Sequence, residues 1–168
     1  LLRMPAGLVC CTGPTGSGKT TTLYAMLEHL NRRENSVMSV EDPVEFQMDG
    51  ITQIRVDQQA GLNFTTAMRH ILRQDPDVIL CGEIRDLTTL QTVIQAALTG
   101  HLVLTTLHTN NAVGAIRRMI DVAGDRFLIS SSVTGVLAQR LLRKVCPDCA
   151  AEREPTEEET AWLQASGV

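Results

Sequence analysis

The feature that most constrains this chain is the octapeptide Gly13–Thr20, which matches the phosphate-loop pattern G-x-x-x-x-G-K-[ST] at every position. An apolar run before it, Leu8–Thr12, predicts a buried strand, and Thr21–Leu30 after it carries apolar residues at helical spacing. Strand, glycine loop and helix form the context that the motif requires. The alternative is a glycine-rich turn that binds nothing, and the complete match in this context disfavours it.

The chemistry of phosphate binding explains the residue types in the loop. Glycines open backbone conformations closed to other residues and allow a close approach to a polyphosphate. Backbone N–H groups at the start of the following helix then face its oxygens. We expect Lys19 to reach the outer phosphates and the Thr20 hydroxyl to bind Mg²⁺. The predicted nucleotide-binding residues are Gly13, Pro14, Thr15, Gly16, Ser17, Gly18, Lys19, Thr20 and Thr21.

Length and charge narrow the choice of function. A chain of 168 residues is long enough for one domain with its own hydrophobic core. A net charge of −4 and an aromatic content of 3% disfavour a general nucleic-acid binder that stacks bases. No apolar run approaches the length of a membrane span. The chain starts without an initiator Met or the features of a signal peptide, so we expect a piece of a longer protein.

An acidic cluster follows the second predicted strand, Val37–Val40. It contains Glu41, Asp42 and Glu45, and Pro43 fixes the loop that carries it. Carboxylates just beyond the carboxyl end of a strand lie on the ligand side of a parallel sheet. A solvated acidic turn is an equally good interpretation of this stretch alone.

A single glutamate, Glu83, follows the third apolar strand, Asp77–Cys81. An apolar strand that ends in an acidic residue downstream of a phosphate loop is typical of nucleotidases, although Gly82 here replaces the usual aspartate. A glutamate at that point can hold Mg²⁺-bound water or orient the attacking water. The alternative is a carboxylate that only caps the next helix, and the phosphate loop favours the functional role.

Two histidines bound the next predicted strand, which runs from His101 to Thr106. His108 follows it, in a polar stretch that continues to Asn110. Polar residues at a strand end beside a nucleotide often contact the γ-phosphate. A lone histidine is more often structural, but the pair and its polar neighbours favour a γ-phosphate sensor.

The remaining segments read mainly as helices. Residues 63–74, 87–98 and 112–120 have helical periodicity, with Asn63 or Thr65 expected to cap the first of these helices and Asp86 the second. Asp125 is expected to cap a helix whose apolar residues continue to Leu137. Gln139–Val145 is interpreted as a last strand or a helix end. Ile51–Val56 alternates in polarity and predicts a half-exposed strand, at an edge or in a hairpin, on which Arg55 is solvated or senses phosphate.

The five cysteines separate into two kinds. Cys10, Cys11 and Cys81 lie in apolar strands and are expected in the core, and an odd number of cysteines is typical of a reducing compartment. Cys146 and Cys149 form a C-x-x-C pair, which is half of a tetrahedral zinc site. No second pair follows, and the context disfavours a thioredoxin-like redox role. An acidic linker and a short final helix complete the chain.

Taken together, these motifs resemble the secretion-ATPase superfamily over nearly the whole chain. They are the phosphate loop, the acidic stretch Val40–Glu45, the glutamate block Asp77–Asp86, the histidine stretch Thr99–Asn110, and Gln139–Leu141 with the cysteine pair. The most similar branch comprises the type II secretion and type IV pilus assembly ATPases. The resemblance implies an α/β fold, a RecA-like P-loop NTPase core with a mainly parallel sheet flanked by helices. We expect that core at residues 1–145, and a truncated cysteine-pair subdomain and linker at 146–168.

The resemblance also implies roles for single residues. Lys19 and Thr20 would hold the phosphates and Mg²⁺, and Glu83 would be the catalytic glutamate, with the Gly82 before it expected in this family. The "Asp box" (Glu41, Asp42 and Glu45) would help to place metal and water, with Glu41 catalytic and Mg²⁺ held through water by Asp42 and Glu83. The "His box" would place His101 and the catalytic His108 near the γ-phosphate.

The activity implied is that of an ATP-hydrolysing motor. Such enzymes form hexameric rings at the cytoplasmic face of the inner membrane, which they reach through platform and adaptor proteins, and no direct contact with nucleic acid is expected. Zinc would bind in the full-length protein. The family's N-terminal domain supplies arginines to the nucleotide, so this chain alone should turn over slowly unless its own arginines substitute. The arginines in question are Arg55, Arg69, Arg73 and Arg140.

Two other functions stay open at this point. A DNA-uptake or conjugation motor would share the same core, and a basic stripe with exposed stacking residues would favour it. A nucleotide-gated scaffold without turnover is the other, and Glu83 argues against it.

Overall fold

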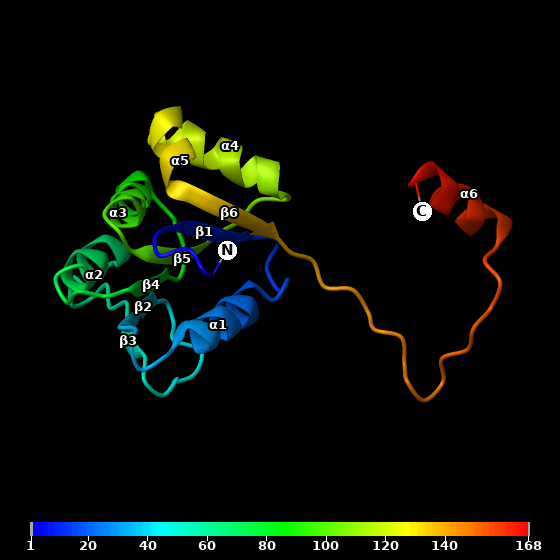
Figure 1. The fold of residues 1–168 in the computed structure, drawn as a ribbon, viewed down its shortest axis with the longest axis horizontal. Helices are drawn as coiled ribbons and strands as arrows, with labels where there is room; N and C mark the ends of the chain where they lie inside the picture. Colours follow the sequence, from blue (N-terminus) through cyan, green and yellow to red (C-terminus); the bar gives the residue numbers. More distant parts are fainter. Residues whose placement is uncertain (1, 168) are drawn as a thin grey trace.

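The computed structural model describes residues 2–167 and contains a six-stranded sheet (Figure 1). The strands are β1 (Gly7–Thr12), β2 (Val37–Glu41), β3 (Thr52–Arg55), β4 (Val78–Cys81), β5 (Leu102–Leu107) and β6 (Val133–Ala138). Their order is β3-β2-β4-β5-β1-β6, and every neighbouring pair is parallel. Every residue of β1, β2, β4 and β5 is buried, which explains why these segments read as almost continuous apolar runs.

Helices cover both faces of this sheet. They are α1 (Lys19–Leu30), α2 (Phe64–Ile71), α3 (Leu87–Leu98), α4 (Ala112–Ala123) and α5 (Arg126–Ser132), whereas a further helix, α6 (Glu157–Ala165), contributes no buried residue. The apolar side of α1 packs on one face of the sheet, whereas buried residues of α2, α3, α4 and α5 pack on the other (Figure 1). The predicted α/β architecture with a mainly parallel sheet is confirmed.

Side-chain caps fix where the helices begin. Asn63, Asp86, Asn111 and Asp125 each accept a hydrogen bond from a backbone N–H in the first turn of the helix that follows. Three of these positions were predicted from the sequence, and Asn111 was not. Each cap fixes the residue at which the preceding loop ends and the helix begins. The loops after β4 and β5 therefore have defined end points.

The segment after Asp125 corrects the sequence prediction. The expected helix ends at Ser132, and Val133–Ala138 forms β6, which pairs in parallel with β1. Gln139–Val145, predicted as a strand or helix end, has neither structure. The spacing of Val133, Val136 and Leu137 suits a helix, but pairing with the distant β1 prevails over this local pattern.

The strand β3 and the segment beyond Ala138 lie at the margins of the fold. β3 is an edge strand, as predicted, and its parallel pairing with β2 excludes the hairpin. Beyond Ala138 the chain leads away from the sheet, and α6 contributes no buried residue (Figure 1). The sheet thus ends before the boundary at 145, which stays a prediction. Among residues 2–167, no helix has both the length and the apolar character needed to cross a membrane.

Candidate functional site

The loops that follow β1, β2, β4 and β5 surround one large cavity. Its volume is about 730 Å³, and its lining includes residues of all four loops. All strands are parallel, so these loops leave the same edge of the sheet, where ligands bind in open α/β folds. The fold therefore brings together the phosphate loop, the Asp box, Glu83 and His108, which lie far apart in the sequence.

The phosphate loop has a backbone that only glycine can follow. Gly13, Gly16 and Gly18 have φ values of +152°, +75° and +83°. A Cβ on Gly13 would lie 2.5 Å from the carbonyl oxygen of Gln139 and 2.6 Å from Ser17 Oγ. Gly13 is thus required by its backbone conformation and by the close packing of the chain around it, whereas Gly16 and Gly18 are favoured by their positive φ angles.

Lys19 and Ser17 place two hydrogen-bond donors in the phosphate loop. Lys19 Nζ donates to the carbonyl oxygens of Gly13 and Pro14, both at 2.9 Å, and burial lowers the pKa of this ammonium group. Ser17 Oγ is buried and has no hydrogen-bond partner among the described residues. A buried ammonium group and a buried hydroxyl without a partner fit a phosphate that accepts from both.

The two threonines after Lys19 lie beside the cavity, and Thr20 is the predicted metal ligand. Thr20 and Thr21 are exposed and line the cavity at the start of α1. A hydroxyl at this point of a phosphate loop is a typical Mg²⁺ ligand. The residues present therefore fit a magnesium–nucleotide pair.

The Asp box divides into one buried and two exposed carboxylates. Glu41, at the end of β2, is 3% exposed and accepts hydrogen bonds from the Tyr24 hydroxyl, from Ser39 Oγ at 2.5 Å and from Gln53 Nε2 at 3.2 Å. Burial and the Glu41 contact raise the pKa of Tyr24 to about 12. Asp42 and Glu45 are exposed and line the cavity. Glu41 thus ties β2 to α1 and β3, because its oxygens are engaged inside the protein.

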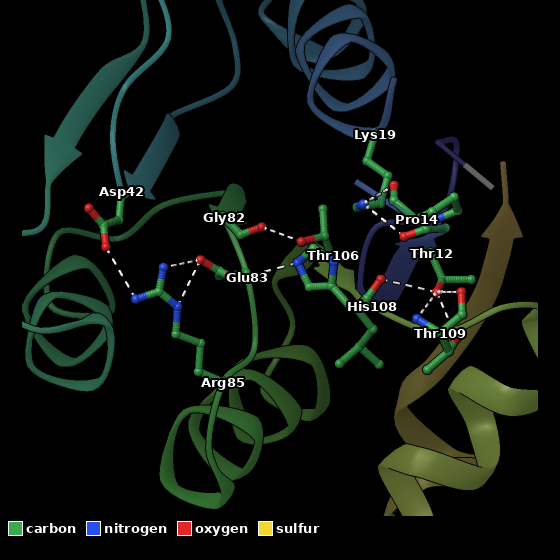
Figure 2. Close-up of polar contacts among 12 residues, drawn as sticks. Thr12, Pro14, Lys19, Asp42, Gly82, Glu83, Arg85, Thr106, His108 and Thr109 are labelled. Carbon is green, nitrogen blue, oxygen red and sulfur yellow. Dashed lines mark hydrogen bonds and ion pairs between the residues drawn. The ribbon is translucent and has the colours of Figure 1, made fainter. Parts of the chain in front are cut away.

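Glu83 lies between a permanent cation and a histidine (Figure 2). One carboxylate oxygen accepts from Arg85 Nε at 2.8 Å and from Arg85 Nη2, and the other lies 3.6 Å from His108 Nε2. Thr106 Oγ1 donates to the carbonyl oxygen of Gly82 at 2.7 Å, which fixes the loop just before Glu83. The side chain of Glu83 is 22% exposed and lines the cavity, so it is accessible to a water molecule there.

The two histidines lie at opposite ends of β5, so the prediction that His101 joins His108 near the γ-phosphate is wrong. His108 follows the carboxyl end of β5 and lines the cavity. His101 precedes β5, and its Nδ1 lies 3.0 Å from the carbonyl oxygen of Ala96, at the end of α3. A strand separates the two residues by its whole length, so His101 is structural and does not join the site.

Three residues that sequence reasoning gave no separate role take part in the site. Tyr24 holds Glu41, and Arg85 holds Glu83. Gln139 accepts from the Thr22 hydroxyl at 2.9 Å, and its backbone N–H donates to Thr12 O at 2.8 Å. Gln139 belongs to the motif Gln139–Leu141, but nothing in the sequence indicates that it packs against the phosphate loop.

The arginines named as substitutes for the missing domain are unequally placed. Arg55, Arg69 and Arg73 are exposed and do not line the cavity. Arg140 donates to the carbonyl oxygen of Asn110, and its charge contributes to lowering the pKa of Lys19. Arg140 is thus the one of the four that lies near the phosphate loop.

The cysteine pair lies outside this site. Cys146 and Cys149 are exposed, and hydrogen bonds from backbone N–H groups of Asp148 and Cys149 help to lower the pKa of Cys146. Within residues 2–167, no group of three or more His, Cys, Asp or Glu side chains is arranged to hold a metal ion. Zinc binding by this pair stays a prediction.

Sequence comparison places these features in a known family. A family model described as "Type II/IV secretion system protein" matches residues 1–168. The type II secretion system ATPase E of Vibrio cholerae is 55% identical over 159 residues, and so is the type II secretion system protein E of Aeromonas hydrophila. Each alignment covers 95% of this chain and 32% of the relative. The chain thus spans about a third of the length of these curated relatives.

Solved structures share this fold. The pilus retraction motor PilT with bound ADP superposes with a TM-score of 0.80 at 38% identity, over 87% of this chain and 46% of that one. The Legionella pneumophila ATPase DotB gives a TM-score of 0.76 at 31% identity, over 84% and 42% of the two chains. The RecA-like fold inferred from the motifs is therefore confirmed.

Proposed function

Because this chain belongs to the type II/IV secretion system protein family, we propose that it is the ATP-hydrolysing core of a motor that powers type II protein secretion. The observation that carries the proposal is the shared cavity, where the phosphate loop with Lys19 faces Glu83 across the sheet. The relatives named for type II secretion favour secretion over pilus assembly.

Binding of ATP rests on the phosphate loop. Backbone N–H groups at the start of α1 surround the phosphates, and Lys19 exchanges its carbonyl partners for phosphate oxygens, which carry more charge. Thr20 would hold Mg²⁺ directly, and Asp42 and Glu83 would contribute through water. When bound, the metal ion supplies positive charge against the phosphate oxygens.

Hydrolysis rests on Glu83. Its carboxylate accepts a hydrogen bond from the attacking water and orients it in line with the γ-phosphate. His108 lies on the other side of this carboxylate, where it can contact the same water or the phosphate. Glu41, whose contacts are internal, acts by holding the Asp-box loop in place through Tyr24.

The motor context follows from the family. We propose that the full-length protein forms a hexameric ring at the cytoplasmic face of the inner membrane, held there by platform and adaptor proteins of the secretion machine. Arginines outside this chain complete the site, so residues 1–168 alone should turn over ATP slowly. The cysteine pair supplies half of a zinc site in the full-length protein.

The test compares two variants of the full-length protein. Lys19→Ala should weaken binding of a fluorescent ATP analogue by at least about tenfold, because it removes the charge that faces the phosphates. Glu83→Gln should bind the analogue normally, while phosphate release falls by about 10²- to 10⁴-fold. Lys144→Ala and Glu157→Gln, exposed in the C-terminal segment, are the matched controls. Normal hydrolysis by Lys19→Ala would refute the proposal.

A further inference from the structure

The guanidinium group of Arg85 lies between Asp42 and Glu83 (Figure 2), and Arg85 is not among the residues that line the cavity. Its guanidinium group divides its donors between two carboxylates that come from different strands. Nε and Nη2 donate to Glu83 after β4, and Nη1 lies 3.3 Å from Asp42 Oδ2 after β2. The planar fork of an arginine suits such a bridge, which the single point charge of a lysine cannot reproduce.

This bridge belongs to a chain of polar contacts across three neighbouring strand ends. Asp42, Arg85, Glu83 and His108 follow β2, β4 and β5, which are adjacent in the sheet. Arg85 is the member that joins the Asp-box loop to Glu83. The position of Asp42 is thereby transmitted to the carboxylate that faces the cavity.

Packing restricts where Arg85 can go. Its Cζ lies 5.7 Å from the ring centroid of Phe64, the first residue of α2, which is 7% exposed. A guanidinium group over an aromatic face is attracted to it and keeps its planar orientation. Arg85 is therefore oriented by Phe64 below and by a carboxylate on each side.

From this geometry we propose that Arg85 is a positioning residue for Glu83, which sets the carboxylate for hydrolysis only when the Asp-box loop is in place. The proposal rests on the function proposed above. Arg85 does not touch the nucleotide, so its loss should lower kcat and leave nucleotide affinity unchanged. Because the ion pairs are partly exposed, they contribute little to folding stability.

The experiment measures steady-state ATP hydrolysis by the full-length protein. Arg85→Gln should lower kcat by about 10- to 100-fold, because small misplacements of catalytic groups have effects of this size. KM, affinity for a fluorescent ATP analogue and the melting temperature should stay near wild-type values. Arg85→Lys should retain part of kcat. The matched control is Arg33→Gln. Arg33 is exposed and precedes the amino end of β2, whereas the cavity lies at the carboxyl ends of the strands.

A double variant tests the link to Asp42. Asp42→Asn should lower kcat by a smaller factor in Arg85→Gln than in the wild-type background, because the part of its effect that acts through Arg85 is already lost, while its water-mediated contribution to Mg²⁺ remains. Multiplied effects would overturn the link. The proposal also fails if Arg85→Gln keeps kcat within about twofold, or if KM and melting temperature change as much as kcat does. If the wild type hydrolyses ATP and the variants give one of these contrary results, only the role of Arg85 is overturned. If the wild type does not hydrolyse ATP, the proposed function is overturned as well.

Discussion

The sheet with helices α1 to α5 and the tail, residues 142–167, are stabilised in different ways. In the sheet, whole strands are buried and a single apolar core lies on each face. In the tail, α6 has no buried residue and depends on contacts within a few positions, namely the Thr156 cap and the Arg153–Glu159 ion pair. No cavity-lining residue lies in the tail.

The site and the tail therefore depend on different kinds of contact. The cavity depends on strand ends brought together by long-range pairing, so changes in the sheet should alter both stability and binding. Changes in the tail should stay local.

Two leucines give the most direct test. Leu104 in β5 is 0% exposed and Leu142 in the tail is 89% exposed. Leu104→Ala should lower the free energy of unfolding by about 2–5 kcal/mol, because it leaves a cavity in the core. Leu142→Ala should change it by less than about 0.5 kcal/mol. Urea denaturation followed by circular dichroism measures both, and equal effects would contradict the contrast.

Tyr24→Phe tests the buried carboxylate at the edge of the cavity. It leaves Glu41 with one donor fewer in a buried position, so we expect a loss of about 1–3 kcal/mol in the free energy of unfolding. Nucleotide affinity should fall as well, because Glu45 N donates to the same hydroxyl at 3.2 Å and the Asp-box loop loses this contact.

Denaturant titration and analogue binding check the Tyr24 prediction. Trp162→Phe, an aromatic substitution in exposed α6, is the matched control and should change neither quantity. An unchanged free energy of unfolding in Tyr24→Phe would mean that Ser39 and Gln53 alone satisfy Glu41.

The local parts of this architecture could be predicted from the sequence. Apolar runs located β1, β4 and β5, and the octapeptide located the phosphate loop, because a fully buried strand and a glycine turn are encoded by adjacent residues. The caps at Asp86 and Asp125 were predicted for the same reason, since a cap satisfies N–H groups within three positions.

The errors and omissions have a common cause in contacts between distant segments. β6 was assigned to a helix because its pairing with β1 is invisible to local periodicity. His101 was placed in the site because the direction of β5 relative to the cavity is a property of the assembled sheet. The bridge from Arg85 to Asp42 joins loops of different strands, so no spacing in the sequence indicates it.

Removal of the tail tests whether the sheet keeps its stability and its nucleotide binding without it. A chain that ends at Val145, which is 77% exposed, loses α6 and both exposed cysteines. The free energy of unfolding of the sheet should change by less than about 0.5 kcal/mol, because no buried residue is lost. Denaturation and analogue binding of the shortened chain measure this. A marked loss in either would show that the tail packs on the sheet in solution.

The smallest effect concerns α6 at low pH. Hydrogen bonds from Arg153 and from the Thr156 N–H lower the pKa of Glu159 to about 2. Because the pKa of this carboxyl is depressed in the folded state, its contribution is complete above pH 4.5 and is lost as the pH falls toward 2. Glu159 closes the capping box of a nine-residue helix, which is too short to be stable alone.

Trp162, the single tryptophan of the chain, lies in α6 and reports on this transition. We expect its fluorescence to change in acid below pH 4.5, and Glu159→Gln to show the altered signal already at neutral pH. Arg153→Gln should move the midpoint of the acid transition toward higher pH, because it removes the main cause of the low pKa. Glu158→Gln, on the same turn but without the cap contact, is the control. If Glu159→Gln and Arg153→Gln both give the wild-type fluorescence profile, the helix does not depend on its cap, and the local account of the tail is wrong.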